Sequence, residues 1–214
     1  MPKPTEIKLK VCGLRDNIEE VAALSPDLVG FIFYNKSPRF LGDLEDDVIR
    51  QLPSTIDKVG VFVNSPEEYV LEMVNRYDLQ YAQLHGDESP EYCKDLQGQG
   101  VKIIKVFGGN TELSNELLSQ YASCIDFYLF DTRTDKYGGT GHQFDWNRLK
   151  GLNLQKPIFL SGGIDLESIE QLDEIKDLDI YAIDVNSKFE ISPGMKSIEL
   201  LGKLKTKMKG LVKN

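Results

Sequence analysis

The 214-residue chain is an ordinary globular mixture, 41% hydrophobic and 28% charged, which argues against intrinsic disorder. Acidic residues outnumber basic ones 34 to 25, and the formal charge of −9 argues against a general nucleic-acid binder, which needs a basic surface. No apolar run approaches the ~20 residues of a membrane span, and the first residues lack the apolar core of a signal peptide. Three cysteines, an odd count, are typical of reduced thiols, so we expect a cytoplasmic protein without membrane or nucleic-acid partners.

Short β-branched or aromatic runs alternate with longer amphipathic stretches along the chain. The predicted strands are Ile7–Cys12, Leu28–Phe33, Asp57–Val63, Tyr81–His85, Lys102–Phe107, Asp126–Asp131, Pro157–Ser161 and Ile180–Val185. The predicted helices are Asp16–Leu24, Asp43–Leu52, two with a serine cap followed by a proline, Thr111–Ala122, a short one after Phe144, one from Asp165 and a final one from about Pro193. The two start signals with a serine cap are Ser65-Pro66 and Ser89-Pro90. Strands that alternate with helices imply right-handed crossovers and a parallel sheet.

Eight strand–helix units in one compact chain predict an α/β fold closed into a single (β/α)8 TIM barrel, with residues 1–214 as one domain. The alternative is an open, doubly wound sheet. A dinucleotide-binding open sheet should show G-x-G-x-x-G after an early strand, whereas Cys12-Gly13-Leu14-Arg15 follows the first strand here. We therefore favour the barrel.

Polar residues at the predicted strand ends are candidates for chemistry, because the active sites of such barrels lie at the carboxyl ends of the strands. These positions are Cys12, Tyr34 to Arg39, Asn64, His85, Asp131, Gly162-Gly163 and Asp184 to Ser187. Gly162 and Gly163 precede a predicted helix start, and the backbone N–H groups at a helix start favour an anion. We expect that anion to be a phosphate, with Asn186 and Ser187 beside it. The alternative interpretation is two turn glycines without a ligand.

Three further side chains each allow two interpretations. Asp131 ends an apolar run, so partial desolvation would raise its pKa and suit a general acid, whereas the alternative, which the pattern alone favours, is a helix or turn cap. Cys12 is either an ionisable base exposed to a ligand or a buried packing residue, the role that we expect for Cys93 and Cys124. Arg39 either pairs with a ligand carboxylate or phosphate or is solvated at the surface.

The chain has two histidines, which give little support for a zinc site, and we expect no metal. His85 is either an acid–base group or a hydrogen-bonded structural residue, and we favour the structural interpretation. His142 lies in a glycine-rich loop, residues 138–142, whose composition is that of a loop able to cover a ligand.

The motifs also form an ordered set from about residue 7 to 205. They are Lys10–Leu14, Val29–Phe33, Ser37–Arg39, Val59–Asn64, Gln83–Gly86, Leu129–Thr132, Gly138–Trp146, Leu160–Gly163, Asp184–Val185 and Pro193–Gly194. Taken in order, they closely resemble the N-(5′-phosphoribosyl)anthranilate isomerase family of tryptophan biosynthesis. The glycine pair alone would be weak evidence, whereas the ordered set is specific.

The resemblance implies a single barrel that catalyses an Amadori rearrangement without metal or organic cofactor, as a monomer or homodimer. Its small phosphorylated substrate would be converted to 1-(2-carboxyphenylamino)-1-deoxyribulose 5-phosphate. In this family Asp131 would be the general acid that protonates the furanose ring oxygen, and Cys12 the general base that removes the C2 proton. Arg39 would hold the anthranilate carboxylate. The remaining implied binding residues are Gly162, Gly163, Asn186 and Ser187 for the phosphate, and Asp184 in a supporting role.

One position departs from the family pattern. Lys188 stands where the family commonly has a glycine beside the phosphate site, and a positive φ there would strain a lysine. Two other functions remain open. One is a different phosphosugar isomerase, such as the aminoaldose isomerase of the histidine pathway, which usually pairs two aspartates. The other is a non-catalytic phosphosugar-binding barrel, for which Cys12 and Asp131 would be dispensable.

Overall fold

The structure is a computed structural model. It describes residues 6–42, 44–108, 111–131, 145–175 and 177–209. The predicted ligand-covering loop, residues 138–142 with His142, lies outside these ranges. Within them, no helix is both long enough and apolar enough to cross a membrane.

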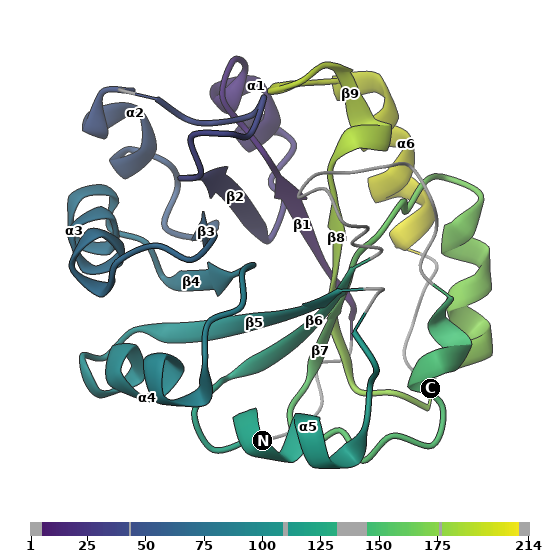
Figure 1. The fold of residues 1–214 in the computed structure, drawn as a ribbon. Helices are drawn as coiled ribbons and strands as arrows, with labels where there is room; N and C mark the ends of the chain where they lie inside the picture. Colours follow the sequence, from purple (N-terminus) through teal and green to yellow (C-terminus); the bar gives the residue numbers. More distant parts are fainter. Residues whose placement is uncertain (1–5, 43, 109–110, 132–144, 176, 210–214) are drawn as a thin grey trace.

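Eight parallel strands close into a barrel in chain order, so the predicted TIM barrel is confirmed (Figure 1). The strands are β1 (Lys8–Cys12), β2 (Leu28–Ile32), β3 (Asp57–Phe62), β4 (Tyr81–Leu84), β5 (Lys102–Gly108), β6 (Phe127–Asp131), β7 (Ile158–Leu160) and β8 (Ile180–Val185). The open-sheet alternative is wrong because β1 pairs with β8, from Lys8 opposite Ala182 to Val11 opposite Val185.

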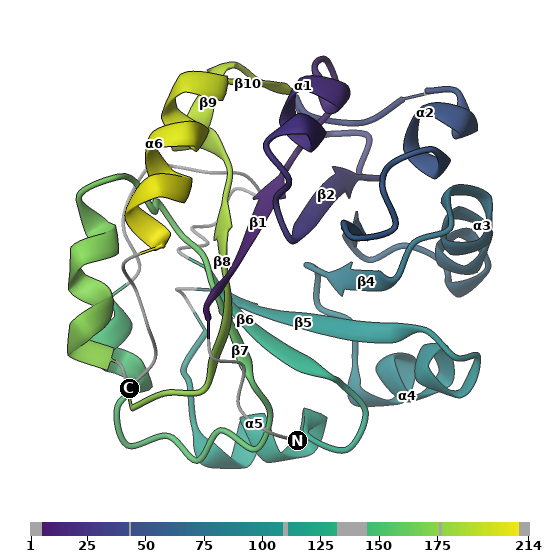
Figure 2. The ribbon, with the colours of Figure 1, turned by 180° about the vertical axis from the view of Figure 1, so that it is seen from behind.

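Helices lie outside the ring of strands, as the two opposite views show (Figures 1 and 2). They are α1 (Ile18–Ala23), α2 (Asp46–Arg50), α3 (Glu67–Tyr77), α4 (Pro90–Gly98), α5 (Asn115–Tyr121), the 3₁₀ helices η1 (Trp146–Leu149) and η2 (Ser168–Ile175), and α6 (Ile198–Met208). The start signal at α4 is confirmed, because the Ser89 side chain accepts a hydrogen bond from the Tyr92 N–H. At α3 the predicted serine cap is wrong, since Pro66 is the N-cap and makes no side-chain cap.

The segment between β8 and α6 differs from the prediction. A 3₁₀ turn, η3 (Ser187–Phe189), leads into an antiparallel hairpin of β9 (Glu190–Ser192) and β10 (Met195–Lys196). The final helix therefore begins at Ile198 and not near Pro193, and the Ser197 side chain caps it. The hairpin lies beside the start of α1 (Figure 2), where two backbone N–H groups of the β1–α1 loop donate to the Gly194 carbonyl.

Alternation along the strands separates the apolar core into two layers. The smaller layer has members on strands only and fills the barrel interior: Leu28, Val59, Tyr81, Ile104, Val106, Leu129, Phe159 and Ala182. The larger layer includes the buried residues of the helices and lies between the helices and the outer face of the strands. Neighbours along a strand fall into opposite layers, such as Leu28 inside and Val29 outside. The interior layer ends below the carboxyl ends of the strands, which leaves the barrel mouth to polar groups.

Candidate active site

The polar groups at the mouth follow from the period of two along each strand. Gln83 comes two residues after Tyr81, Asp131 two after Leu129, and Asp184 two after Ala182, and each of these earlier residues lies in the interior layer. The three polar side chains therefore face the same inner space, one layer nearer the mouth. Cys12 and Lys10 share this face on β1, because Lys10 pairs in register with Asp184.

Cys12 ends β1 and is 4% exposed, so its thiol is buried at the end of the strand. The facing residue on β2 is Gly30, and a Cβ atom there would come within 2.9 Å of Sγ, so the thiol needs a glycine opposite it. Burial raises the pKa of Cys12, whereas the charges of Lys10 and Lys196 lower it. Two ammonium groups thus favour the thiolate, while burial and the Asp184 carboxylate oppose it, and the pKa of Cys12 is raised overall.

Lys10 is a part of the site that the sequence analysis did not single out. Its ammonium is fully buried and lies 2.9 Å from the Asp184 carboxylate and 2.7 Å from the Gln83 amide oxygen. Burial would lower the pKa of Lys10, but Asp184 and Cys12 outweigh it and raise the pKa. The available signal was a lysine two residues before the cysteine and therefore on the same face of the strand, although Lys8 shares that face.

Gln83 and His85 continue this polar chain to Asp131. An ammonium has donors only, so the Gln83 oxygen must face Lys10 and its NH2 group must face His85. Gln83 Nε2 lies 3.1 Å from His85 Nδ1, which makes Nδ1 the acceptor and places the proton of the neutral ring on Nε2. That nitrogen lies 3.4 Å from Asp131 Oδ2. His85, which we expected to be structural, therefore contacts the proposed acid directly.

Asp131 lies at the end of β6, as predicted, and its side chain is 24% exposed, so it is partly desolvated but reachable from the mouth. Two strands, β7 and β8, separate it from Cys12 around the ring. Cys93 and Cys124 are buried away from the mouth, in α4 and after α5, in agreement with the packing role expected for them.

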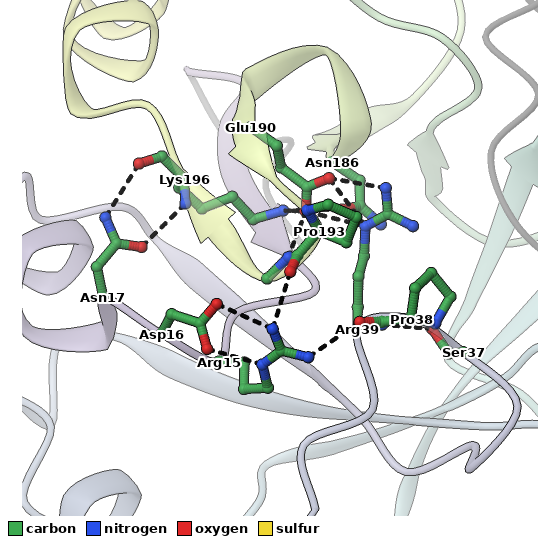
Figure 3. A network of polar contacts seen from close by, with 11 residues as sticks. Arg15, Asp16, Asn17, Ser37, Pro38, Arg39, Asn186, Glu190, Pro193 and Lys196 are labelled. Carbon is green, nitrogen blue, oxygen red and sulfur yellow. Dashed lines mark hydrogen bonds and ion pairs between the residues drawn. The ribbon is translucent and has the colours of Figure 1, made fainter.

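Arg39 lies in the β2–α2 connection and is not a solvated surface residue. Its guanidinium forms a two-pronged ion pair with Glu190 of β9 (Figure 3). Glu190 also accepts from the Lys196 ammonium, which in turn donates to the Asn186 side chain. Arg15 donates to the carbonyls of Pro38 and Pro193 and thereby joins the connections after β1, β2 and β8. Asn186 thus belongs to the Arg39 cluster.

Glu190 and Lys196, like Lys10, were missed by the sequence analysis. Each belongs to a hairpin whose position on the barrel is set by long-range contacts, and no local pattern marks them.

Gly162 and Gly163 follow β7 with φ of 89° and 69°, a conformation that favours glycine. The helix expected from Asp165 begins instead at Ser168, so the glycine pair is not at a helix start. The Asp165 carboxylate accepts hydrogen bonds from the N–H groups of Glu167 and Ser168. Any anion near the glycines would therefore meet the N–H groups of the turn and not those of η2.

Lys188, which stands where the family commonly has a glycine, has no positive φ in the loop after β8. Ser187 begins η3, and the exposed Lys188 sits in the same turn without a positive φ, so the anticipated strain is absent. The pKa of Asp165 is lowered chiefly by the hydrogen bonds that it accepts from Ser168 and Glu167, and the Lys188 charge adds to this effect. Among the described residues, no three His, Cys, Asp or Glu side chains are grouped so that they could hold a metal ion.

Residues 9–207 match the family model for N-(5′phosphoribosyl)anthranilate (PRA) isomerase. The chain belongs to this family. A PRA isomerase of Parabacteroides distasonis is 44% identical over 197 residues, which cover 90% of this chain and 89% of the relative. A PRA isomerase of Staphylococcus haemolyticus is 37% identical over 194 residues, covering 88% of this chain and 91% of the relative.

Solved structures agree with the family. The PRA isomerase of Thermotoga maritima superposes with a TM-score of 0.81 at 30% identity, covering 96% of this chain and all of the other. A further PRA isomerase, solved in complex with reduced 1-(o-carboxyphenylamino)-1-deoxyribulose 5-phosphate, has a TM-score of 0.71 at 26% identity, over 96% of this chain and 100% of that one. The chain is therefore an enzyme, an isomerase of tryptophan biosynthesis, and the family expected from its motifs is confirmed.

Proposed function

We propose that this protein converts N-(5′-phosphoribosyl)anthranilate to 1-(2-carboxyphenylamino)-1-deoxyribulose 5-phosphate, with Asp131 as general acid and Cys12 as general base. The observation that carries the proposal is the shared position of these two groups. Both end barrel strands at the same mouth, and a chain of polar contacts leads from Lys10 through Gln83 and His85 to Asp131. The charge of the same Lys10 acts on Cys12. A sugar lying over β7 and β8 would meet a proton donor on one side and a base on the other.

The chemistry needs one proton donor and one proton acceptor. Asp131 donates its proton to the furanose ring oxygen while the bond from that oxygen to C1 breaks, and the nitrogen lone pair forms the C1–N double bond. The Cys12 thiolate then removes the proton from C2, and the electrons of that C–H bond form the C1–C2 double bond as the iminium becomes an enamine. The resulting enol loses its hydroxyl proton and gains one at C1, which gives the ketone. The sum is an isomerisation with no net gain or loss of protons.

The ammonium groups near Cys12 support its role as a base. The neutral thiol is a poor base, and burial raises the pKa of Cys12 further. Lys10 and Lys196 act in the opposite direction, and Asp184 holds Lys10 in place through the 2.9 Å ion pair. We therefore assign Asp184 a supporting role, as a carboxylate that fixes the lysine beside the thiol.

The two anionic ends of the substrate need separate sites. We assign the phosphate to the turn of Gly162 and Gly163 together with Asn186 and Ser187, because two glycines with positive φ put no Cβ atom between the turn's N–H groups and a ligand. We assign the anthranilate carboxylate to Arg39, whose planar guanidinium matches a carboxylate. The reduced carboxyphenylamino-deoxyribulose phosphate bound to the related PRA isomerase carries both groups in one molecule.

We also propose that residues 1–214 form one domain. The strands of the barrel run from Lys8 to Val185, and the family match extends from residue 9 to residue 207.

The test is a fluorescence assay that follows consumption of the anthranilate substrate by the wild type and by Asp131→Asn. Asp131→Asn removes the transferable proton but keeps size and polarity, so turnover should be nearly abolished while the affinity for the reduced product analogue is retained. Asp46→Asn, an exposed aspartate paired with Arg76, is the matched control and should turn over normally. Near-normal turnover by folded Asp131→Asn would contradict the acid assignment, and an inactive wild type would contradict the function itself.

A further inference from the structure

One edge of the Arg39 guanidinium is occupied by a carboxylate of the protein itself. Nε lies 2.9 and 3.0 Å from the two oxygens of Glu190, and Nη2 lies 2.7 Å from Oε2 (Figure 3). Of the two side chains, 11% of Arg39 and 5% of Glu190 are exposed. In the described part of the chain, Nη1 has no hydrogen-bond partner, so the end-on edge formed by Nη1 and Nη2 can take a second carboxylate.

Glu190 is itself held by the hairpin that carries it. The Lys196 ammonium donates to Oε1 over 2.7 Å, and the Gly194 N–H donates to the same oxygen over 3.3 Å. Lys196 is fully buried, and its backbone N–H and C=O are both bonded to the Asn17 side chain. Removing the carboxylate would leave two largely buried cations without a counter-ion, so Glu190 does not yield its place to a ligand.

The cluster of Arg39, Lys196 and Glu190 carries a surplus positive charge. Burial alone would raise the pKa of Glu190, but hydrogen bonds and charges from Arg39 and Lys196 outweigh burial and lower the pKa, so the carboxylate is ionised. Burial lowers the pKa of Lys196, and the ion pair with Glu190 opposes that change. One carboxylate thus faces two cations, and a second carboxylate on the free edge of Arg39 would balance the cluster.

The Arg39 side chain also passes close to the proposed base. A Cβ atom on Gly13, the residue after Cys12, would lie 2.8 Å from Arg39 Cδ and 2.8 Å from Asn186 Oδ1. The stem of Arg39 therefore lies against the end of β1. A ligand whose carboxylate is held by this guanidinium would therefore lie on the β1 side of the mouth, near Cys12.

We propose that Glu190, anchored by Lys196, is a positioning residue that turns the Arg39 guanidinium so that its end-on edge receives the aromatic carboxylate of the substrate. This role rests on the proposed function of Arg39 and adds a determinant of specificity to it. A guanidinium that is already fixed loses little side-chain freedom when the ligand binds. Glu190 therefore contributes to affinity through the carboxylate and leaves the contribution of the phosphate unchanged.

The test compares two probes that differ in one group. The first is reduced 1-(2-carboxyphenylamino)-1-deoxyribulose 5-phosphate, and the second is its phenylamino counterpart without the carboxylate. Titration calorimetry gives the ratio of their dissociation constants for the wild type and for Glu190→Gln, which keeps the shape but removes the charge. We expect the preference for the carboxylated probe to fall about tenfold in Glu190→Gln, with KM raised by a similar factor and kcat little changed. The second probe should bind both proteins equally, which a general structural defect would not allow.

Further variants separate this role from the proposed function. In Arg39→Ala the preference should be nearly lost, and adding Glu190→Gln to it should cause no further change in the ratio. Glu199→Gln, an exposed glutamate paired with Lys203, is the matched control and should leave the ratio unchanged. Glu190→Asp is the substitute variant if Glu190→Gln does not fold. Aspartate keeps the charge opposite Lys196 but is too short for the two-pronged contact with Arg39, so we expect the same loss of preference.

Each contrary result has a distinct meaning. An unchanged preference in Arg39→Ala would overturn the carboxylate site itself. A preference lost in Arg39→Ala but intact in both folded Glu190 variants would overturn the role of Glu190 alone. Tighter binding of the carboxylated probe by Glu190→Gln would show that Glu190 competes with the ligand and would likewise overturn the positioning role.

Discussion

Lys10 and Asp184 lie directly opposite each other on neighbouring strands β1 and β8, and their 2.9 Å ion pair is buried beside the Cys12 thiol. A single positive charge therefore has two functions here. It balances a buried carboxylate, and it favours the thiolate form of the proposed base. Removing it should change the pH dependence of catalysis and the stability of the fold in ways that can be measured separately.

We predict that Lys10→Met shifts the activity profile to higher pH. If Cys12 is the base, as proposed, its thiolate is the form that acts, so kcat/KM of the wild type should rise with pH. Burial raises the pKa of Cys12 above its ordinary value. Without the lysine, which lowers that pKa, the rise should move further up, and each pKa unit costs about tenfold in activity near neutral pH. A profile of kcat/KM against pH for both proteins checks this. An unshifted profile would mean that Cys12 is not the titrating base.

The same substitution should destabilise the fold by about 3–5 kcal/mol near neutral pH, because it leaves Asp184 buried without its cation. Burial already raises the folded-state pKa of Asp184 above the ordinary carboxyl value, and removing Lys10, whose charge and hydrogen bond lower that pKa, raises it further. The cost is therefore present above that folded-state pKa and fades as the pH falls toward the ordinary carboxyl value near ~4. Urea unfolding at several pH values measures it. The double variant Lys10→Met with Asp184→Asn, which removes both charges, should recover much of the loss.

Cys12→Ser is predicted to reduce turnover by roughly 10²–10⁴-fold, because a hydroxyl hardly ionises near neutral pH and a positioned base contributes about this factor. The matched controls are Cys93→Ser and Cys124→Ser, also buried, which should affect stability by about 1–3 kcal/mol and leave turnover intact. Turnover of the three variants is compared after circular dichroism confirms folding. If Cys12→Ser turns over as well as the controls, Cys12 is a packing residue and the base lies elsewhere.

His85→Asn is predicted to lower kcat by about tenfold while the affinity for the reduced product analogue changes little. The ring nitrogen facing Asp131 at 3.4 Å holds the proposed acid in position, and Gln83 sets which nitrogen carries the proton. Asparagine is too short to span both partners. Single-turnover kinetics and a binding titration separate the two effects. A variant with normal kcat would restore the purely structural interpretation of this histidine.

Gly13→Ala is predicted to weaken substrate binding more than Gly42→Ala. Both glycines have positive φ, 71° and 70°, so both substitutions carry the same backbone strain of roughly 1–2 kcal/mol. At Gly13 the new methyl group would also collide with Arg39 and Asn186, whereas nothing lies within 4 Å of the same position at Gly42. KM values and thermal unfolding of the two variants make the comparison. Equal KM values would show that the contact with Arg39 is not relevant to binding.

The sequence was sufficient to predict where the eight strands lie and that they close into a barrel. Strand and helix periods are local properties, so β1, β6 and β8 appear within a residue or two of their predicted limits. The same register predicted that Cys12 and Asp131 would end strands at one mouth. Errors occurred where local signals were weak, as in the 3₁₀ start at Ser168 and the β9–β10 hairpin.

The charges at the site were decided by tertiary structure. Arg39 and Glu190 are 151 residues apart, and Lys10 and Asp184 are 174 apart, so no local pattern relates the members of either pair. Barrel closure places β1 beside β8, and the hairpin after β8 folds back over the β2 connection. Burial then sets which charges must be paired, because an uncompensated ion is costly away from water. The residue types and their order along the chain thus determine the barrel and its family, whereas the partner of each charge depends on distances that exist once the barrel has closed.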